Sequence, residues 1–266
     1  MTAYSTYLTD STTMLRRNVR HMRRYPMLFF IAGIPIVLLL LFAYVFGGTL
    51  GAGLGGLAGG LTGGRADYVA YVVPGILLIT IAGGAQGTAI SVAMDMKEGI
   101  VARFRTMPIS RASVLTGHVL ANVLQTMLAI AIVVVVAVLI GFRATTGPLE
   151  WIAATGLLGL TALAFTWIAV ALGLVSKSVE TASNLPMPLM LLPFFGSGFV
   201  PTASMPDPLR WFADNQPFTP IMETVRQLLL GGEIGSGGLI AVAWCVAITL
   251  AGYLWAQRLY DRDPAR

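Results

Sequence analysis

The chain has 266 residues, of which 56% are hydrophobic and 11% are charged, and its formal net charge is +5. Soluble domains have roughly 25% charged residues, so this composition excludes an ordinary soluble enzyme and indicates a protein that lies mostly in lipid. The positive charge gives no case for nucleic-acid binding, because basic residues of this number are typical of the cytoplasmic loops of membrane proteins.

Residues 1–26 predict an amphipathic helix at the cytoplasmic membrane surface. Leu15, Val19 and Met22 recur at helical spacing, and basic residues occupy the other face. The arginines that we assign to this interface helix are Arg16, Arg20 and Arg23. Two interpretations stay open, a simple membrane anchor or an additional contact with a cytoplasmic partner.

Long apolar runs predict membrane-spanning helices, since about 20 apolar residues cross a hydrocarbon core of about 30 Å. Four runs meet this length, Met27–Phe46, Tyr68–Met94, Val114–Phe142 and Trp151–Val175. Two shorter runs, Leu185–Val200 and Leu239–Trp255, reach it only with mildly polar neighbours. The sequence therefore predicts an all-α polytopic membrane protein with six transmembrane helices in residues 27–257, followed by a cytoplasmic tail at 258–266.

Basic residues predict the orientation of these spans. Of the 17 lysines and arginines, 13 lie in the two terminal segments and the alternate loops that we assign to the cytoplasm, and four lie on the other side. Both termini are therefore expected to face the cytoplasm, in agreement with an even number of spans.

The loop at residues 47–64 is rich in glycine, which has high backbone entropy and no side chain to pack. It predicts a flexible outer tether in preference to a binding site.

The fifth apolar run contains several prolines, among them Pro186, Pro188 and Pro193, which predict kinks because each lacks an N–H donor. A hinge that lines an apolar pathway and a bent helix in a bundle are both compatible with this pattern.

The outer segment 201–237 predicts a short helix. Thr219 and Pro220 are typical of a helix start, and an apolar stripe from Ile221 to Leu229 follows. This helix is too short to span, and Glu223 and Arg226 stand at the spacing of an ion pair. It closes the bundle surface in one interpretation and gates the outer mouth in another.

Several kinds of chemistry have no pattern in this sequence. Neither lysine, Lys97 or Lys177, stands in a glycine-rich nucleotide-binding loop, and no His-Glu-x-x-His zinc motif occurs. No charged residue falls at the centre of a predicted span, where ion-driven carriers bind their ion. The single cysteine, Cys245, allows no intrachain disulfide. The chain therefore resembles a pathway without an energy source of its own.

The segment 95–112 is a charged island between two long uncharged runs, with six charges in residues 95–111. Residues 95–106 predict a short helix that leaves the membrane, and Pro108 ends it. Phe104 between charged neighbours is typical of an apolar anchor for a pocket on a partner. A cytoplasmic loop that merely follows the positive-inside rule is the alternative.

Sequence motifs in three places carry a family resemblance. Asp95-x-x-x-Gly99, followed by Arg103-Phe104-Arg105 and by Pro108-Ile109-Ser110-Arg111, resembles the signature of type-2 ATP-binding-cassette (ABC) transporter permeases. Phe199-Val200-Pro201 and Asn215-Gln216-Pro217-Phe218-Thr219-Pro220 are similar to stretches near the last span in the daunorubicin-resistance branch of these permeases.

The resemblance implies one membrane subunit of a larger transporter. Two permease chains, expected as a homodimer, would assemble with two copies of a cytoplasmic ATPase subunit that binds ATP and magnesium, so this chain itself carries no catalytic residue, cofactor or metal. The residues that would couple to the ATPase are Glu98, Gly99, Arg103, Phe104, Arg105 and Pro108. The residues that would line the substrate pathway in the first, second and fifth spans are Phe29, Phe30, Gln86, Met187, Met190 and Phe194.

The sequence thus predicts the permease subunit of an ATP-driven exporter in a bacterial cell membrane. Its cargo is expected to be a hydrophobic or amphiphilic compound such as a drug, an antibiotic or a lipid. Two alternatives remain, a secondary carrier driven by an ion gradient and a membrane scaffold that transports nothing.

Overall fold

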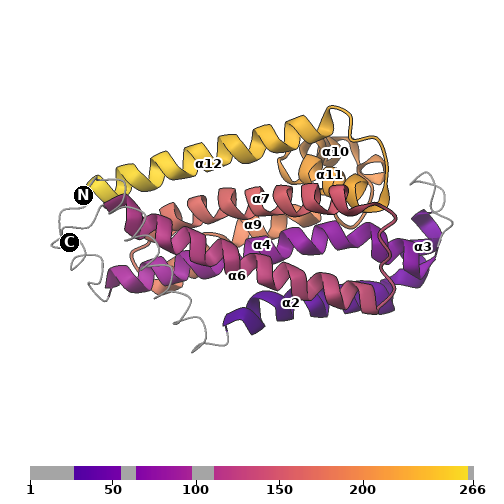
Figure 1. Cartoon of the computed structure of the whole chain (residues 1–266), viewed down its shortest axis with the longest axis horizontal. Helices are drawn as coiled ribbons and strands as arrows, with labels where there is room; N and C mark the ends of the chain where they lie inside the picture. Colours follow the sequence, from indigo (N-terminus) through magenta and orange to yellow (C-terminus); the bar gives the residue numbers. More distant parts are fainter. Residues whose placement is uncertain (1–26, 55–63, 98–110, 263–266) are drawn as a thin grey trace.

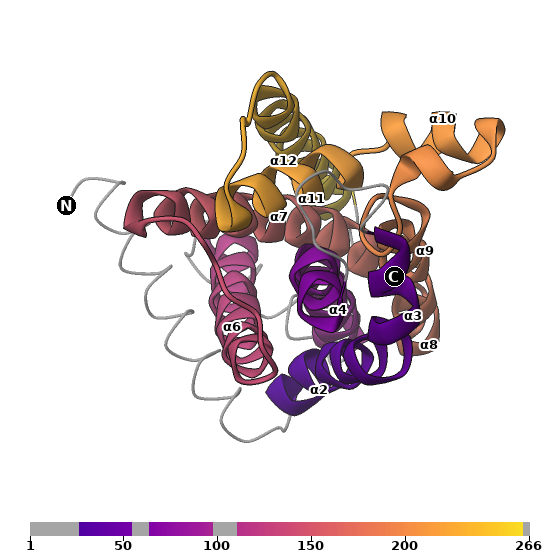
Figure 2. The same ribbon diagram turned by 90° about the vertical axis from the view of Figure 1, so that its right-hand side faces the viewer.

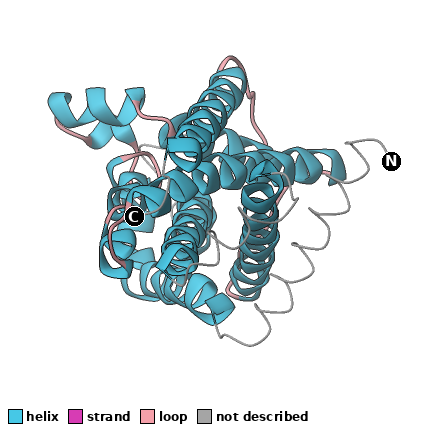
Figure 3. Cartoon of the chain, turned by 90° about the vertical axis from the view of Figure 1, so that its left-hand side faces the viewer, coloured by secondary structure: helices cyan, strands magenta, loops and turns pink. Residues whose placement is uncertain are grey.

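Helices make up the regular structure of the described residues. The structure is a computed structural model, and it describes residues 27–54, 64–97 and 111–262. Figure 3 shows helices joined by short loops, and no strand occurs in these three ranges. The all-α prediction is confirmed for this part of the chain.

Five helical stretches of the described residues are long and apolar enough to cross a membrane. They are the continuous stretch α2 (Met27–Leu41), η1 (Phe42–Phe46) and α3 (Gly47–Leu54), and the helices α4 (Arg65–Lys97), α6 (Arg111–Leu139), α7 (Pro148–Val175) and α12 (Gly237–Arg262). Each matches one of the predicted runs. A lipid environment favours such helices because they satisfy their backbone hydrogen bonds internally.

The predicted fifth span does not form one continuous helix. The chain between α7 and α12 forms α8 (Val179–Asn184), α9 (Met187–Leu191), the 3-10 turns η2 (Leu192–Phe195) and η3 (Thr202–Ser204), α10 (Asp207–Asn215) and α11 (Phe218–Leu230). Pro186 and Pro188 lack N–H donors and interrupt the helix between α8 and α9, and Gly196 is extended and ends η2. The predicted proline kink is therefore a complete break.

The two ends of the bundle contain different parts of the chain. The end of α4, the beginning of α6 and the end of α12 lie on the left of Figure 1, and α3, α10 and α11 lie on the right. Thr146, in the loop between α6 and α7, donates a hydrogen bond of 2.7 Å to the Leu228 carbonyl of α11. We call these ends the Lys97 end and the Thr146 end.

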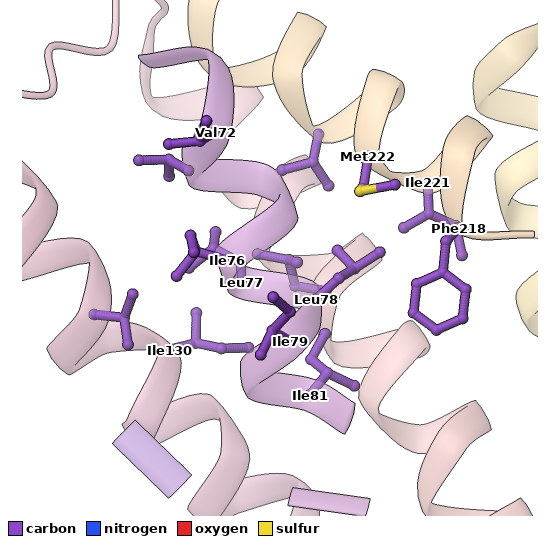
Figure 4. Close-up of a cluster of buried hydrophobic side chains, with 14 of the residues drawn as sticks. Val72, Ile76, Leu77, Leu78, Ile79, Ile81, Ile130, Phe218, Ile221 and Met222 are labelled. Atoms are coloured by element: carbon purple, nitrogen blue, oxygen red, sulfur yellow. The ribbon is translucent and has the colours of Figure 1, made fainter. Parts of the chain in front are cut away.

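Helix α4 is the centre of the bundle. Figure 2 shows it surrounded by α2, α6, α7, α11 and the α8–α9 segment, while α12 packs on the outer side of α7. Every residue from Tyr71 to Thr80 is buried. Figure 4 shows the apolar side chains of α4 between Ile130 of α6 on one side and Phe218, Ile221 and Met222 of α11 on the other.

Small residues allow the helices to approach closely, as is usual in membranes. A Cβ at Gly173 of α7 would lie 2.7 Å from the Ala89 carbonyl oxygen of α4. A Cβ at Gly252 of α12 would lie 2.9 Å from the Ile168 nitrogen of α7. Because neither position has room for a side chain, glycine sets the spacing of the α4–α7 and α7–α12 contacts.

The expectation of a flexible glycine-rich tether is wrong for Gly47–Leu54, which form the helix α3. Each glycine disfavours a helix by about 1 kcal/mol relative to alanine, so the intrinsic helix propensity of these residues does not explain α3. Packing explains this helix, because α3 continues the helical stretch of α2 and η1 and contacts α4. A Cβ at Gly51 would clash with the Gly64 carbonyl, and the guanidinium of Arg65 lies 3.9 Å from the centre of the Tyr44 ring.

The short outer helix is confirmed as α11, although it begins at Phe218 rather than after Thr219. Its apolar stripe includes Ile221 and Val225, and it lies in the main core instead of on the bundle surface. Arg226 does not form the expected ion pair with Glu223. Its guanidinium instead donates to two backbone carbonyls, those of Tyr71 and Ser197.

Candidate functional site

A cavity of about 140 Å³ lies between α2, α4 and α9. This volume is close to that of an apolar cavity of about 150 Å³ that accommodates benzene in another protein. The cavity therefore has room for an apolar group of about one aromatic ring. Its lining residues are Phe30, Ile31, Ile34, Pro35, Ile79, Gly83, Gln86, Gly87, Ile90 and Met190.

One stripe of α4 forms the inner wall of this cavity. Ile79, Gly83, Gly87 and Ile90 recur at spacings of four, four and three residues, so they share one face of the helix. A Cβ at Gly83 would meet no atom within 4 Å. The missing side chain at Gly83 therefore leaves free space in the wall.

The α2 wall is open toward the outside of the bundle. Phe30 is 64% exposed and Ile34 is 51% exposed, although both are apolar. In a membrane, apolar side chains at such exposed positions face lipid or another apolar surface.

Gln86 is the one polar side chain in the lining of this cavity. Its Nε2 donates a hydrogen bond of 2.7 Å to the Ser183 carbonyl at the end of α8. Pro186 and Pro188 lack the N–H groups that would bond to the carbonyls of Ala182 and Asn184, so the helix is interrupted next to Ser183. Gln86 thus connects α4 to the interrupted α8–α9 segment.

The structure brings three of the six predicted pathway residues to this cavity, one from each of the three expected segments. They are Phe30 of α2, Gln86 of α4 and Met190 of α9. Phe194 lies elsewhere and stacks on Phe199, with 4.7 Å between ring centres. Met187 is exposed and is not part of the lining, and the side chain of Phe29 is outside the described part of the structure.

The prediction from sequence missed most of the wall, in particular Ile34, Pro35, Gly83 and Gly87. All six predicted residues have bulky or polar side chains, and glycine has neither. A usable signal was present, because Gly83 and Gly87 are four residues apart and are flanked by Ile79 and Ile90 at helical spacing.

Two groups of predicted residues lie outside the described residues. They are the interface arginines Arg16, Arg20 and Arg23 and the coupling residues Glu98, Gly99, Arg103, Phe104, Arg105 and Pro108. The coupling residues follow Lys97, the last residue of α4.

The Lys97 end also contains the beginning of α8. Glu180, in the first turn of α8, lies close enough to Lys97, the last residue of α4, for their opposite charges to interact. The end of α4 and the beginning of α8 therefore lie close together and carry opposite charges.

Comparison with known proteins gives one family match and several relatives. The family described as "ABC-2 type transporter" matches residues 9–230. The daunorubicin resistance ABC transporter permease protein DrrB1 of Streptomyces coeruleorubidus is 29% identical over 252 residues, which cover 90% of this chain and 85% of the relative. The probable doxorubicin resistance ABC transporter permease protein DrrC of Mycobacterium tuberculosis is 29% identical over 180 residues, which cover 66% of this chain and 64% of the relative.

Proposed function

Because the chain belongs to the ABC-2 type transporter family, we propose that it exports a hydrophobic or amphiphilic compound through the cavity between α2, α4 and α9. A membrane permease of an ABC transporter works with an ATPase, and this one acts as the permease subunit. Both relatives described above are named for resistance to an anthracycline drug, which supports a drug or drug-like cargo for this chain.

The observation that carries the proposal is the composition of the cavity. Nine of its ten lining residues have apolar side chains or none, and the exposed Phe30 and Ile34 form its outer wall. Such a wall attracts a compound that partitions into lipid, because burial of apolar surface in a packed site adds dispersion contacts. A single amide, that of Gln86, then gives the site one polar contact.

The energy for transport comes from the partner ATPase in this proposal. Charged residues of the five span-forming helices lie in their first or last two turns, so no charge in these helices is available to bind a driving ion in mid-membrane. ATP and magnesium bind to the partner, and residues 95–112 transmit its movement to α4 and α6. Two permease chains, a homodimer, assemble with two ATPase copies.

The interrupted segment α8–α9–η2, which replaces the predicted fifth span, completes the six crossings of the proposed topology. Helix α8, which follows α7, begins close to Lys97, and α12 begins at the Thr146 end (Figure 1). The chain between them must pass from one end to the other, and α8, α9 and η2 are the helical part of that passage. With six crossings both termini lie on one side, which the basic residues assign to the cytoplasm of a bacterial cell.

Reconstitution in liposomes tests this function. The full chain is incorporated with and without its ATPase partner, and release of a fluorescent anthracycline across the bilayer is followed with ATP and with a non-hydrolysable analogue. We expect transport only with both subunits and hydrolysable ATP.

Two outcomes would contradict the proposal. Transport by the chain alone that follows an imposed proton gradient would identify a secondary carrier. Stable assembly with the ATPase, without transport or stimulation of ATP hydrolysis by any amphiphile tested, would identify a scaffold.

A further inference from the structure

We propose that the cavity selects ligands that carry a hydrogen-bond donor, a hydroxyl or an ammonium group, beside an apolar ring, and that Gln86 Oε1 is the atom that makes this selection. The inference rests on the proposed function because it assigns the cargo of the same cavity. It adds the chemical group that the cargo must present.

The orientation of the Gln86 amide follows from its partner. The Ser183 carbonyl oxygen can only accept a hydrogen bond, so the nitrogen of the amide must face it, at 2.7 Å. The two ends of an amide group lie on opposite sides of its carbon, and this bond therefore turns Oε1 away from Ser183. Because α8 holds the nitrogen, the position of Oε1 is fixed before any ligand arrives.

Gln86 Oε1 is an unused hydrogen-bond acceptor at this site. Among the described residues no donor bonds to it, although an amide oxygen accepts two hydrogen bonds. Water rarely supplies such a bond within the hydrocarbon region, where an unsatisfied polar group is costly. A ligand hydroxyl or ammonium that reaches Oε1 removes this deficit, whereas an ether or a hydrocarbon leaves it in place.

The rest of the wall defines the body of the ligand. Gly83 has open space above its Cα, and the other lining residues on α2 and α9 are apolar. Gly83 and Gln86 are three residues apart and therefore lie on the same side of α4. A ring against Gly83 thus places a substituent of its edge beside the Gln86 amide.

A matched pair of probes tests the selection. Binding of 1-naphthol and of 1-methoxynaphthalene to the full chain in lipid nanodiscs is measured by equilibrium dialysis, with binding to empty nanodiscs subtracted. The probes differ in the donor hydrogen, which the methyl group replaces. We expect the wild-type chain to bind 1-naphthol about fivefold more tightly, as one net hydrogen bond predicts.

Variants then assign the preference to one residue. Gln86→Leu is expected to bring the ratio of the two dissociation constants to about one while 1-methoxynaphthalene still binds. Met190→Leu, on the opposite wall, is the matched control, and it should shift both constants together and leave their ratio unchanged.

If the wild-type chain bound the two probes equally, or bound 1-methoxynaphthalene more tightly, the inference would be overturned even if Gln86→Leu did not fold. Retention of the fivefold ratio in a folded Gln86→Leu chain would also overturn it. The assay contains no ATP and no ATPase, so failure of ATP-driven export with an intact binding ratio would count against the proposed function alone.

Discussion

The guanidinium of Arg226 in α11 lies over the ring of Tyr71 in α4, with 3.9 Å between Cζ and the ring centre. Its Nε donates to the Tyr71 carbonyl at 3.3 Å and its Nη2 to the Ser197 carbonyl at 2.6 Å. Tyr71 stands three residues before Pro74, in the turn that the proline ring distorts, and its carbonyl accepts this side-chain bond. One cation thus connects α11, α4 and the turn after η2.

Replacement of Arg226 by leucine should destabilise the protein. The substitution removes the donor but leaves the carbonyls of Tyr71 and Ser197 in an apolar region, and loss of charge-assisted bonds costs about 2–3 kcal/mol. The apparent midpoint of thermal unfolding in detergent should fall by about 5 °C or more. Arg210→Leu is the control, because its ion pair with Asp214 is exposed and long, at 3.7 Å. Exposed pairs of this kind contribute less than about 1 kcal/mol, so equal shifts for the two variants would contradict the role of Arg226.

Replacement of Gly75 by alanine should disrupt the contact between α4 and the turn after η2. A Cβ at Gly75 would lie 2.9 Å from both Cα and the carbonyl oxygen of Gly198, and backbone atoms cannot move aside as a flexible side chain can. Overpacking of this kind costs about 1–3 kcal/mol. Gly156→Ala, in α7, is the matched control, since its Cβ would meet nothing within 4 Å. That variant should be unchanged or more stable by up to about 1 kcal/mol in the same unfolding measurement.

The long apolar runs could be predicted because a single physical constraint fixes them. A segment in lipid must satisfy its own backbone, so Tyr68–Met94 and Trp151–Val175 correspond to the helices α4 and α7 with small shifts at their ends. The apolar face of α11 could also be predicted, because Ile221 and Val225 recur at the helical period.

Contacts between distant residues could not be predicted. The helix Gly47–Leu54 depends on packing against α4, which local preference opposes. The partner of Arg226 is Tyr71, 155 residues away, whereas sequence spacing suggested its near neighbour Glu223. Likewise, the family resemblance indicated which spans line the pathway, but only the fold shows that Gly83 leaves open space beside Gln86.

The buried hydroxyl of Thr219 offers a test of unsatisfied polar groups. Among the described residues Thr219 Oγ1 has no hydrogen-bond partner, whereas Thr161 Oγ1 donates to the Leu157 carbonyl at 2.8 Å. Thr219→Val should therefore leave the unfolding midpoint unchanged or raise it, because it removes an unpaired buried group. Thr161→Val should lower it by the equivalent of about 1 kcal/mol. If Thr219→Val is the more damaging of the two, the Thr219 hydroxyl has a bonding partner, such as a bound water.

The charged segment after Lys97 should transmit the movement of the ATPase. Glu98→Lys, and the double variant Phe104→Ala with Arg105→Ala, should abolish most substrate-stimulated ATP hydrolysis and export while the chain still inserts, because they remove the charge and the apolar anchor offered to the partner. Glu233→Lys is the control, since it makes the same charge reversal in the exposed turn before α12. Normal coupled export in the first two variants would show that the ATPase contacts another surface.

Filling the cavity should block the cargo without loss of the fold. Gly83→Leu adds a side chain to the open space of the α4 wall, and about 140 Å³ cannot hold both this side chain and a ring of the cargo. Because a Cβ at Gly83 would meet no atom within 4 Å, we expect the unfolding midpoint to change little. The affinity for 1-naphthol and the rate of ATP-driven export should each fall about tenfold, the effect of roughly 1.4 kcal/mol. Gly33→Leu, in α2, is the control, because its Cβ also meets nothing within 4 Å and Gly33 is not part of the lining. Its affinity and transport should stay within about twofold of wild type, a difference of less than about 0.5 kcal/mol. Equal losses in both variants would mean that added bulk anywhere in the bundle impairs transport, and normal export by Gly83→Leu would exclude this cavity from the pathway.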